Sequence, residues 1–558
     1  GQLFYYGNNQ RRHGGLGQLT KQQPPPYQLT VYRYDEETAP GSWYLDGVVY
    51  HIFVDRFYNG NEGGQVLNPK PGSLIHGCWD DTPVYLRGKD GRIIRWDFFG
   101  GNLNGIRKKL PYFRKLGVTV LYLSPVFTAP SNHKYDTADY LQIDPMFGTE
   151  KDLRRLCAEA AEVGIYVILD GVFSHTGSDS IYFNKEGNYP VVGACQSKDS
   201  PYYFWYRFLE YPEKYECWWG IDTLPNVNEL EPSYLEFILR GRDSVVRYWM
   251  RTGVRGWRLD VADELPVQFL RELRQTVKAM DNQAVVIGEV WEDASNKVSY
   301  GEQRQYFAGD QLDGVTNYPF RQILLDYILG RNSLIDTHYA LMSMVENYPL
   351  PNLAASFTII GSHDVPRILT LLGTELDEFN LTEQEWEHFR LEPQRRELAK
   401  KRLKLLSLFQ FTFPGVPCVY YGDEAGLEGY RDPYNRGTFP WGREDLELQQ
   451  WYMAISRLRR DYAVFRRGNW LSLGLEIAED NPGCRVFGFR RCWQNSVAVA
   501  MFNPDLEKAR TVLLRQSSVG CTELAEIFPG QERLTAADNC FVITLAPLQG
   551  RVFYGETG

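Results

Sequence analysis

Several common signals are missing from this sequence. It has no run of roughly 18 consecutive apolar residues, so nothing in it predicts a membrane-spanning helix. Its nine cysteines include no C-x-x-C pair, which argues against a zinc signature and a disulfide framework. We expect reduced thiols in a cytoplasmic protein. No signal-peptide pattern occurs either, but the chain opens on Gly1 rather than Met, so we expect the natural N-terminus to be missing.

A strongly basic surface is missing as well. The chain has 60 Lys and Arg against 70 Asp and Glu, a net charge of −10, and its basic residues are dispersed. Without a basic stripe to neutralise phosphates, we expect no nucleic-acid partner. Aromatic residues are abundant instead: 14 Trp, 36 Tyr and 30 Phe. Flat rings suit both the apolar faces of sugars and β-rich cores, so composition leaves both interpretations open.

A regular alternation of apolar strands and amphipathic helices begins at Gly47. The strand candidates are residues 48–54, 118–123, 166–169, 256–261, 284–287, 311–315, 357–360 and 416–421. Helix candidates between them are residues 104–116, 150–163, 232–251, 267–280 and 395–411. Eight short strands alternating with helices predict an α/β fold, a (β/α)8 TIM barrel over residues 47–465. A doubly wound open sheet remains the alternative, because periodicity alone does not separate the two.

Three stretches lie outside this alternation. Residues 1–46 are rich in Gly, Gln and Pro and contain one strand candidate, 28–34, so we expect the end of a truncated β-domain plus a linker, or an arm packed on the domain after it. Residues 176–230 are long enough to form an inserted subdomain after strand three. Residues 466–558 contain several strand candidates, which predict a C-terminal antiparallel β-sandwich domain.

Polar side chains follow the apolar strands at the end where a barrel keeps its active site. Strand four ends in Arg258 and Asp260, which lie two apart and so project from the same face of a strand. The other strand ends carry His175 (strand three), Glu289 (strand five), and His363 with Asp364 (strand seven). One such pair alone can be a structural salt bridge. Recurrence at four strands favours a single functional site.

Convergent carboxylates serve two chemistries, metal-assisted hydrolysis and glycoside hydrolysis. Two-metal sites usually carry close ligand motifs such as H-x-H or H-E-x-x-H, and neither occurs here. A retaining glycosidase needs one ionised carboxylate as nucleophile and one carboxylic acid of raised pKa as proton donor. We expect Arg258 to keep Asp260 ionised, and the apolar neighbours of Glu289 to raise the pKa of that side chain.

These four segments resemble the signature regions of the α-amylase family, glycoside hydrolase family 13, and they occur in the same order. Further similar segments are residues 99–103, 135–137, 224–228 and 415–424. The resemblance covers about residues 47–558. It is greatest to neopullulanases, cyclomaltodextrinases and maltogenic amylases, and to related amylopullulanases, through residues 48–57 and 218–220.

The resemblance implies a retaining hydrolase of α-glucan oligosaccharides or polysaccharides, namely maltodextrins, cyclodextrins or pullulan. It would cleave α-1,4 bonds, and cleavage of α-1,6 bonds is left open. Asp260 would be the nucleophile, Glu289 the acid and base, and Asp364 the group that supports distortion of the sugar ring. The alternatives are a transglycosylating glucanotransferase, an exo-acting α-glucosidase, or a non-catalytic carbohydrate-binding relative, which the complete set of carboxylates argues against.

The resemblance also implies further binding residues. Those for sugar are Tyr135, Asp136, His175, Arg258, His363, Asp432 and Arg436. Among them, Asp432 and Arg436 would hold the next glucose outward, with a plain surface ion pair as the alternative. No cofactor is required for the chemistry. A structural calcium would fall at Asn59, Asn61, Gly100 and Asn102, a place without the acidic ligands that calcium prefers. A homodimer is expected if the N-terminal domain of the relatives is present.

Overall fold

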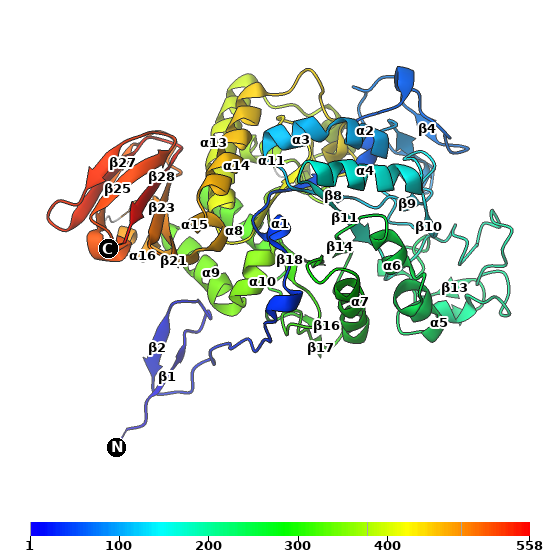
Figure 1. Cartoon of the computed structure of the whole chain (residues 1–558), viewed down its shortest axis with the longest axis horizontal. Coiled ribbons are helices and arrows are strands. Elements are labelled where there is room, and N and C mark those ends of the chain that lie inside the picture. Colours follow the sequence, from blue (N-terminus) through cyan, green and yellow to red (C-terminus); the bar gives the residue numbers. More distant parts are fainter. Residues whose placement is uncertain (1, 377, 481–482, 558) are drawn as a thin grey trace.

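Eight parallel strands close into a barrel at the centre of the molecule (Figure 1). The computed structural model describes residues 2–376, 378–480 and 483–557. The barrel strands are β3 (Val49–Ile52), β8 (Val120–Leu123), β11 (Tyr166–Gly171), β14 (Gly256–Leu259), β15 (Val285–Val290), β18 (Gly314–Asn317), β19 (Phe357–Ile359) and β20 (Val416–Tyr420). They follow one another in chain order, and β20 pairs with β3, with Cys418 opposite Val49. This closure confirms the predicted (β/α)8 barrel and excludes the open sheet.

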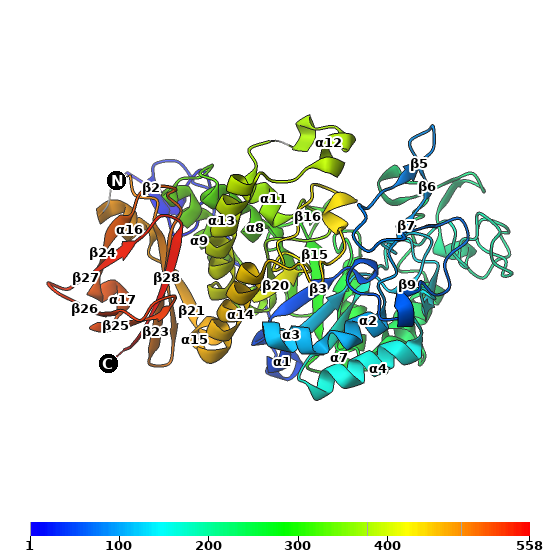
Figure 2. The ribbon, with the colours of Figure 1, turned by 90° about the horizontal axis from the view of Figure 1, so that it is seen from above.

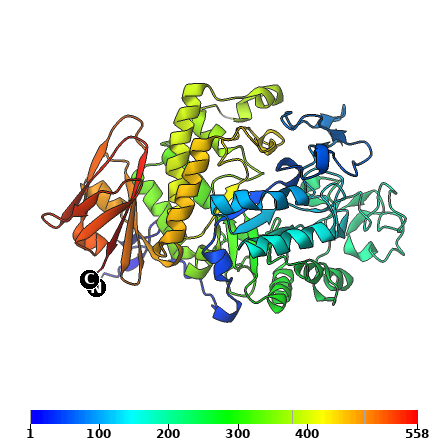
Figure 3. The same cartoon turned by 45° about the horizontal axis from the view of Figure 1, so that its top comes forward.

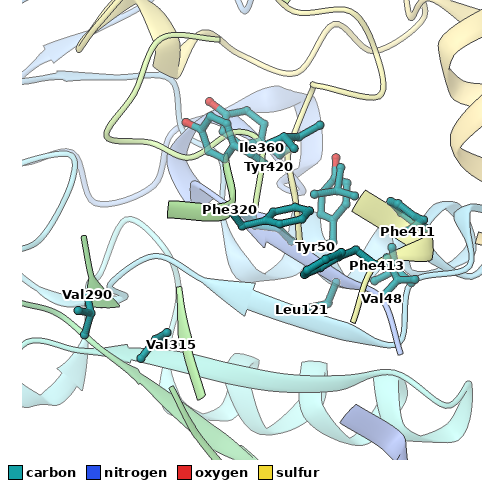
Figure 4. Close-up of a cluster of buried hydrophobic side chains, with 14 of the residues drawn as sticks. Val48, Tyr50, Leu121, Val290, Val315, Phe320, Ile360, Phe411, Phe413 and Tyr420 are labelled. Atoms are coloured by element: carbon teal, nitrogen blue, oxygen red, sulfur yellow. The ribbon is translucent and has the colours of Figure 1, made fainter. Parts of the chain in front are cut away.

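Alternate residues of the barrel strands pack into two different cores. Val49 and Val285 belong to a core inside the barrel, whereas a neighbour such as Tyr50 belongs to the core between the barrel and its helices. The cause is the two-residue period of a strand. Figure 4 shows part of the outer core, in which Phe320 of helix α8 (Tyr318–Ile328) packs against Phe413, with ring centroids 4.8 Å apart. The sequence therefore fills both faces of the barrel wall with apolar side chains.

Helices cover the outside of the barrel. α4 (Glu150–Glu162), α7 (Val267–Met280) and α13 (Pro393–Thr412) lie where helices were predicted. The helix predicted at 104–116 is two helices, α2 (Leu103–Lys108) and α3 (Leu110–Leu116). The single helix predicted at 232–251 is wrong, because the chain leaves the helical conformation at Gly241. This segment consists of α5 (Pro232–Leu235), a π-helical turn (Glu236–Arg240) and α6 (Val245–Met250).

Shorter elements complete the barrel domain and its loops. The further helices in chain order are α1 (Ser42–Leu45), α9 (Leu334–Asn347), α10 (Leu350–Ala355), α11 (Ile368–Gly373), α12 (Glu383–His388), α14 (Leu446–Asp461) and α15 (Val464–Arg467). The paired loop strands are β4 (Leu74–Ile75) with β7 (Asp97–Phe98), β5 (Leu86–Arg87) with β6 (Ile93–Arg95), β9 (Phe127–Thr128) with β10 (Asp139–Ile143), and β16 (Val298–Ser299) with β17 (Glu302–Gln303). Across the described residues, no helix has the length and apolar character to span a membrane.

The N-terminal segment forms a hairpin followed by an extended arm. β1 (Tyr5–Asn8) pairs with β2 (Gly17–Thr20). The strand predicted at 28–34 is wrong, because these residues bond singly to a helix end and a loop of the barrel domain rather than to a strand edge. Thr30 Oγ1 donates to the Asn347 carbonyl at 2.7 Å, and the Arg33 backbone N–H donates to the Ala308 carbonyl at 3.0 Å. The segment is therefore an arm packed on the barrel.

The insertion after β11 is held together mainly by aromatic packing. Its regular elements are the short pair β12 (Phe208–Glu210) and β13 (Lys214–Tyr215) and two 3-10 turns, Tyr203–Trp205 and Trp218–Gly220. Phe183 packs edge-on against Tyr206 and Tyr215, with ring centroids 4.8 and 4.7 Å apart. Aromatic side chains thus replace the regular backbone ladder that this long connection lacks.

The C-terminal region is an antiparallel β-domain beside the helices α13 and α14 (Figure 3). Its larger sheet has the order β21 (Asn469–Ser472), β22 (Phe487–Trp493), β23 (Ser496–Asn503), β28 (Gln549–Glu556), β25 (Glu523–Phe528) and β26 (Arg533–Thr535). A second sheet pairs β24 (Arg510–Arg515) with β27 (Cys540–Leu545), and two helices, α16 (Gly474–Asp480) and α17 (Gln516–Val519), complete the domain. Alternate residues of both sheets are buried together in one core.

Two buried arginines bind backbone carbonyls where the barrel meets this β-domain. Arg459 on α14 donates to the carbonyls of Gly47, Phe465, Leu45 and Gly415. Arg491 on β22 donates to the carbonyls of Thr412 at 2.7 Å and Gly468 at 2.7 Å. Burial lowers the pKa of each guanidinium to about 9. These side chains join segments that are far apart in the sequence.

We predict that Arg459→Ala lowers the free energy of unfolding by about 3 kcal/mol, because it leaves buried carbonyls without a donor. Thermal unfolding followed by circular dichroism measures the effect. Arg460→Ala is the matched control, since the neighbouring Arg460 is 67% exposed and pairs with Asp461 on the surface. Equal melting temperatures for the two variants would contradict this interpretation.

Candidate active site

Four charged side chains project into the barrel above its inner apolar core. Ile168 and Ile287 belong to that inner core, and Asp170 and Glu289 follow each of them by two residues on the same strand. Trp257 and Leu259 face the outer core, so Arg258 and Asp260 face inward. The strand period alone therefore directs one guanidinium and three carboxylates to one place.

Arg258 contacts all three carboxylates. Its Nη1 donates to Asp170 Oδ1 at 2.8 Å and to Asp260 Oδ1 at 3.1 Å, and its Nη2 lies 2.9 Å from Glu289 Oε2. Each of the four side chains is less than a tenth exposed. Buried carboxylates are costly unless they are paired. Here a single cation pairs with all three.

The two carboxylates predicted to do the chemistry both have raised pKa values. Burial raises the pKa of Asp260 well above its usual range, the nearby Glu289 raises it further, and Arg258 lowers it. Burial also raises the pKa of Glu289, in the predicted direction, again against the effect of Arg258. Arg258 lowers the pKa of Asp260, as predicted, but burial and Glu289 outweigh this effect, and the one guanidinium is shared among three carboxylates. Two such neighbours favour a state in which they share one proton.

Asp364 joins the site through its aromatic neighbours. Tyr318 Oη donates to Asp364 Oδ2 at 3.2 Å, and His363 Nε2 lies 3.3 Å from Asp364 Oδ1. The same His363 nitrogen lies 2.6 Å from Tyr135 Oη, and that hydroxyl donates to Asp170 Oδ2 at 2.9 Å. A continuous set of polar contacts therefore leads from Asp170 through Tyr135 and His363 to Asp364.

Both predicted histidines are buried and neutral. Burial lowers the pKa of His175 to about 4, and burial together with nearby Arg436 lowers the pKa of His363 well below its usual range. His175 lies beside Trp218, with ring centroids 5.8 Å apart. His363 Nδ1 is buried and has no hydrogen-bond partner among the residues that the structure describes.

The outer predicted residues have two different roles. Asp136 accepts hydrogen bonds from the backbone N–H of Ser131, at 3.2 Å, and from its hydroxyl, so it holds the turn that carries Tyr135. Arg436 Nη1 lies 2.9 Å from Asp432 Oδ1, and Arg436 Nε donates to the His363 carbonyl at 3.1 Å. Arg436 is only 7% exposed. The pair is therefore not a plain surface ion pair.

The four residues of the predicted calcium loop do lie together, but as a hydrogen-bonded turn. Asn102 Oδ1 accepts the backbone N–H of Gly105 at 2.8 Å, and Asn59 Oδ1 accepts that of Asn61 at 3.0 Å. Asn102 Nδ2 donates to the Gly100 carbonyl at 3.2 Å. These oxygens already have donors, and no group of three or more potential metal-ligating His, Cys, Asp or Glu side chains occurs among the described residues. The arrangement does not fit a hard cation well, and calcium stays a prediction.

Sequence reasoning missed several residues of this site. Asp170 was recognisable, because it ends strand three as Asp260 follows strand four. Tyr122 Oη donates to Asp170 Oδ2 at 2.6 Å. Trp291 Nε1 donates to Glu289 Oε1 at 3.2 Å and stacks on Tyr318, with ring centroids 3.8 Å apart. Tyr318 carries no sequence signal, since it lies at a helix start and only the closed barrel brings it to Asp364.

Asp260 and Glu289 lie close enough together for one carboxyl group to attack a substrate atom while the other protonates the leaving group. Asp260 and Glu289 are both within hydrogen-bond distance of Arg258, so a substrate atom near one carboxyl is near the other. Glu289 Oε2 also accepts the backbone N–H of Val261 at 2.9 Å, which fixes its direction. A pair of acids that share one proton supplies a nucleophile and a proton donor together.

A family comparison agrees with this arrangement. The family described as "Alpha amylase, catalytic domain" matches residues 51–463. The chain is 39% identical to an amylopullulanase from Thermoanaerobacterium saccharolyticum over 532 residues, which cover 88% of this chain and 40% of that protein. It thus spans well under half the length of the amylopullulanases that it matches.

Shorter relatives are covered more fully. A cyclomaltodextrinase from Geobacillus thermopakistaniensis is 36% identical over 450 residues, which cover 79% of this chain and 66% of that protein. The structure of a cyclic α-maltosyl-(1→6)-maltose hydrolase from Arthrobacter globiformis superposes with a TM-score of 0.73 at 25% identity. The superposition covers 93% of this chain and all of that one.

We predict that Asp260→Asn raises the melting temperature at pH 7 by a few degrees. The folded-state pKa of Asp260 lies above the unfolded value, so ionisation costs stability as pH rises above the unfolded pKa of about 4. The gain should therefore shrink as pH falls toward 4. Thermal scans at both pH values measure it, with Asp243→Asn, a 74% exposed carboxylate, as control. A lower melting temperature of the Asp260→Asn variant at pH 7 would contradict a raised pKa of Asp260 in the folded protein.

Proposed function

The chain belongs to the alpha-amylase family, and from this we propose that it is a retaining α-glucan hydrolase. Its substrates are maltodextrins, cyclodextrins or pullulan, and it cleaves α-1,4 glucosidic bonds, with α-1,6 bonds as a second candidate. The observation that supports this most is the set of acids around Arg258, with Asp260 and Glu289 on the same guanidinium. Relatives named amylopullulanase and cyclomaltodextrinase support the class of substrate.

The proposed reaction has two displacements. Asp260 attacks the anomeric carbon, the bond from this carbon to the bridging oxygen breaks, and Glu289 gives its proton to that oxygen. A covalent glycosyl-enzyme forms. Glu289 then takes a proton from water, the water oxygen bonds to the anomeric carbon, and Asp260 leaves as a carboxylate. The first displacement leaves Glu289 as the carboxylate that the second displacement needs as a base, and the second displacement restores the carboxylic acid.

The neighbours of the two acids support this division of roles. Glu289 accepts hydrogen bonds from Trp291 and from the Val261 backbone, which hold its two oxygens in fixed directions for proton transfer. Departure of that proton leaves a carboxylate that Arg258 and both donors stabilise. Asp364 carries no bond to Arg258 among those described, and it is 26% exposed. It is therefore placed to accept sugar hydroxyl groups, as are the neutral rings of His175 and His363.

Three further expectations remain proposals. All nine cysteines are free thiols, which supports the predicted cytoplasmic location. The predicted structural calcium is not needed by any step above, because carboxyl groups supply both the nucleophile and the proton. The predicted homodimer is tested by sedimentation velocity, which measures the mass of the protein in solution.

Product analysis on maltotriose, pullulan and β-cyclodextrin tests the proposed function. Because one carboxylate attacks the glucosyl carbon of an α-1,4 bond, maltotriose is expected to give maltose and glucose. Panose from pullulan indicates α-1,4 cleavage, and maltotriose from pullulan indicates α-1,6 cleavage. Products longer than the substrate indicate a transferase, and glucose as the sole first product from every chain indicates an α-glucosidase. Failure to cleave any of the three would overturn the proposal in favour of a carbohydrate-binding protein.

We predict that Asp260→Asn lowers kcat by at least about 10³-fold while sugar binding persists, since an amide cannot form the covalent intermediate. Steady-state kinetics on maltotriose and calorimetric titration with maltose separate the two effects. Asp243→Asn serves again as the surface control. Activity close to that of the unmodified protein would remove Asp260 from the role of nucleophile.

A further inference from the structure

The residue after Asp260 has an unusual backbone conformation. Val261 has a φ of +38°, and it is the one β-branched residue with a positive φ in the part of the chain that the structure describes. A β-branched side chain crowds its own backbone at such a φ, so this conformation costs free energy and persists only where the surrounding structure enforces it. The turn that follows Asp260 must therefore be held in place by contacts with its neighbours.

The conformation of Val261 directs two backbone N–H groups to the proposed acid. The Val261 N–H donates to Glu289 Oε2 at 2.9 Å, and the next N–H, of Ala262, donates to the Glu289 carbonyl at 3.2 Å. The angle φ of Val261 sets the orientation of one of these N–H groups relative to the other. Relaxation to an ordinary negative φ would therefore break at least one of the two hydrogen bonds.

Asp263 fastens this turn to the loop after β15. Its carboxyl group accepts a hydrogen bond from Tyr306 Oη and lies 3.1 Å from Lys297 Nζ. Arg304 donates to the carbonyl of Asp263 at 2.5 Å and to that of Leu265 at 3.0 Å. The side chain and the backbone of Asp263 are thus both held by the same loop, two residues after Val261.

The loop that provides these donors is itself well anchored. It contains β16 and β17 and lies on the same side of the barrel as β5, β6 and α12 (Figure 2). Tyr306 is fully buried, Arg304 is 4% exposed, and the Arg304 backbone N–H donates to the Lys297 carbonyl at 2.8 Å. Buried donors have already lost most of their side-chain freedom, so they hold the turn at little further entropic cost.

We propose that Asp263 is a positioning residue, whose contacts with Lys297, Arg304 and Tyr306 hold Val261 in its strained conformation and thereby orient Glu289 for proton transfer. The inference rests on the proposed function. In this role Asp263 acts through the backbone of Val261 rather than on the substrate. The Val261 N–H also lowers the pKa of Glu289, so loss of this donor raises that pKa.

Asp263→Ala tests the role in catalysis. We expect kcat/KM on maltotriose to fall about 10-fold or more, mainly through kcat. We also expect the basic limb of its pH profile to move to higher pH, because Glu289 then keeps its proton to a higher pH. The other titratable groups that face Glu289 stay in place in this variant, namely Arg258, Asp260, Asp364, Tyr122 and Tyr318.

Two further variants complete this experiment. Tyr306→Phe removes one hydroxyl group and keeps the buried ring, so it should act in the same direction with a smaller effect, and it keeps the test open should Asp263→Ala fail to fold. Asp310→Ala is the matched control, since Asp310 belongs to the same connection and its side chain is 48% exposed. Unchanged kcat/KM in the two test variants, or a loss of activity with an unshifted pH profile, would overturn the proposal.

Val261→Gly tests whether backbone strain is the link between Asp263 and Glu289. Glycine adopts a positive φ at little cost, so Asp263 has less strain to hold in this background. We expect Asp263→Ala to lower kcat about 10-fold or more on its own, and about 2-fold or less when it is added to Val261→Gly. Equal effects in the two backgrounds would overturn the role of the strained turn.

The melting temperatures of the same four proteins provide a comparison that needs no substrate. Only proteins that keep Asp263 hold the strain at Val261, so Val261→Gly should favour stability more in the unmodified protein than in the Asp263→Ala variant. Additive changes in melting temperature would overturn the inference, whatever the substrate is. Failure of the unmodified protein to cleave any glucan would instead overturn the proposed function.

Discussion

The charge balance around Arg258 is the constraint on which the whole site depends. One guanidinium inside the barrel contacts Asp170, Asp260 and Glu289, and each of these side chains is less than a tenth exposed. Two of the three negative charges can be neutralised only by sharing protons or by ligands. A substitution at any one carboxylate therefore changes the protonation of the others. The free-energy effects of substitutions at these carboxylates should therefore not be additive, because the four side chains interact with one another.

The two-residue period of a strand made the barrel strands and part of the site predictable from the sequence. Apolar residues at alternate positions located the barrel strands, and the same period placed Arg258 and Asp260 on one face. The segments that sequence failed to predict lack such a constraint. Gly241 interrupts an otherwise periodic helix, and residues 28–34 alternate like a strand but meet a helix end and a loop instead of a strand edge. Tyr318 reaches Asp364 only because the barrel closes, which no local pattern encodes. From the sequence, Arg258 was expected to pair with Asp260 alone, because these two residues lie close together on one strand. The fold adds Asp170 and Glu289 from the neighbouring strands.

Scaffold and loops contribute to specificity in different ways. The acids sit on strands whose positions are set by buried apolar residues on both faces, so their geometry tolerates little change. The parts that meet the outer sugars come from connections, including Asp432 after β20. Connections tolerate insertion and deletion far better than barrel strands do. Proteins with the same acids can therefore differ in the chains they accept through these connections.

The arginines between the barrel and the β-domain have a consequence for how such chains can be recombined. Arg459 lies within the matched catalytic region, which ends at residue 463, yet it donates to the carbonyl of Phe465 beyond that end. Arg491, deep in the β-domain, reaches back to the last turn of α13 at Thr412. A crossover placed at the apparent domain boundary separates donors from their carbonyls on both sides. A workable graft must therefore keep both arginines, together with a backbone that presents the same carbonyls to them across the seam.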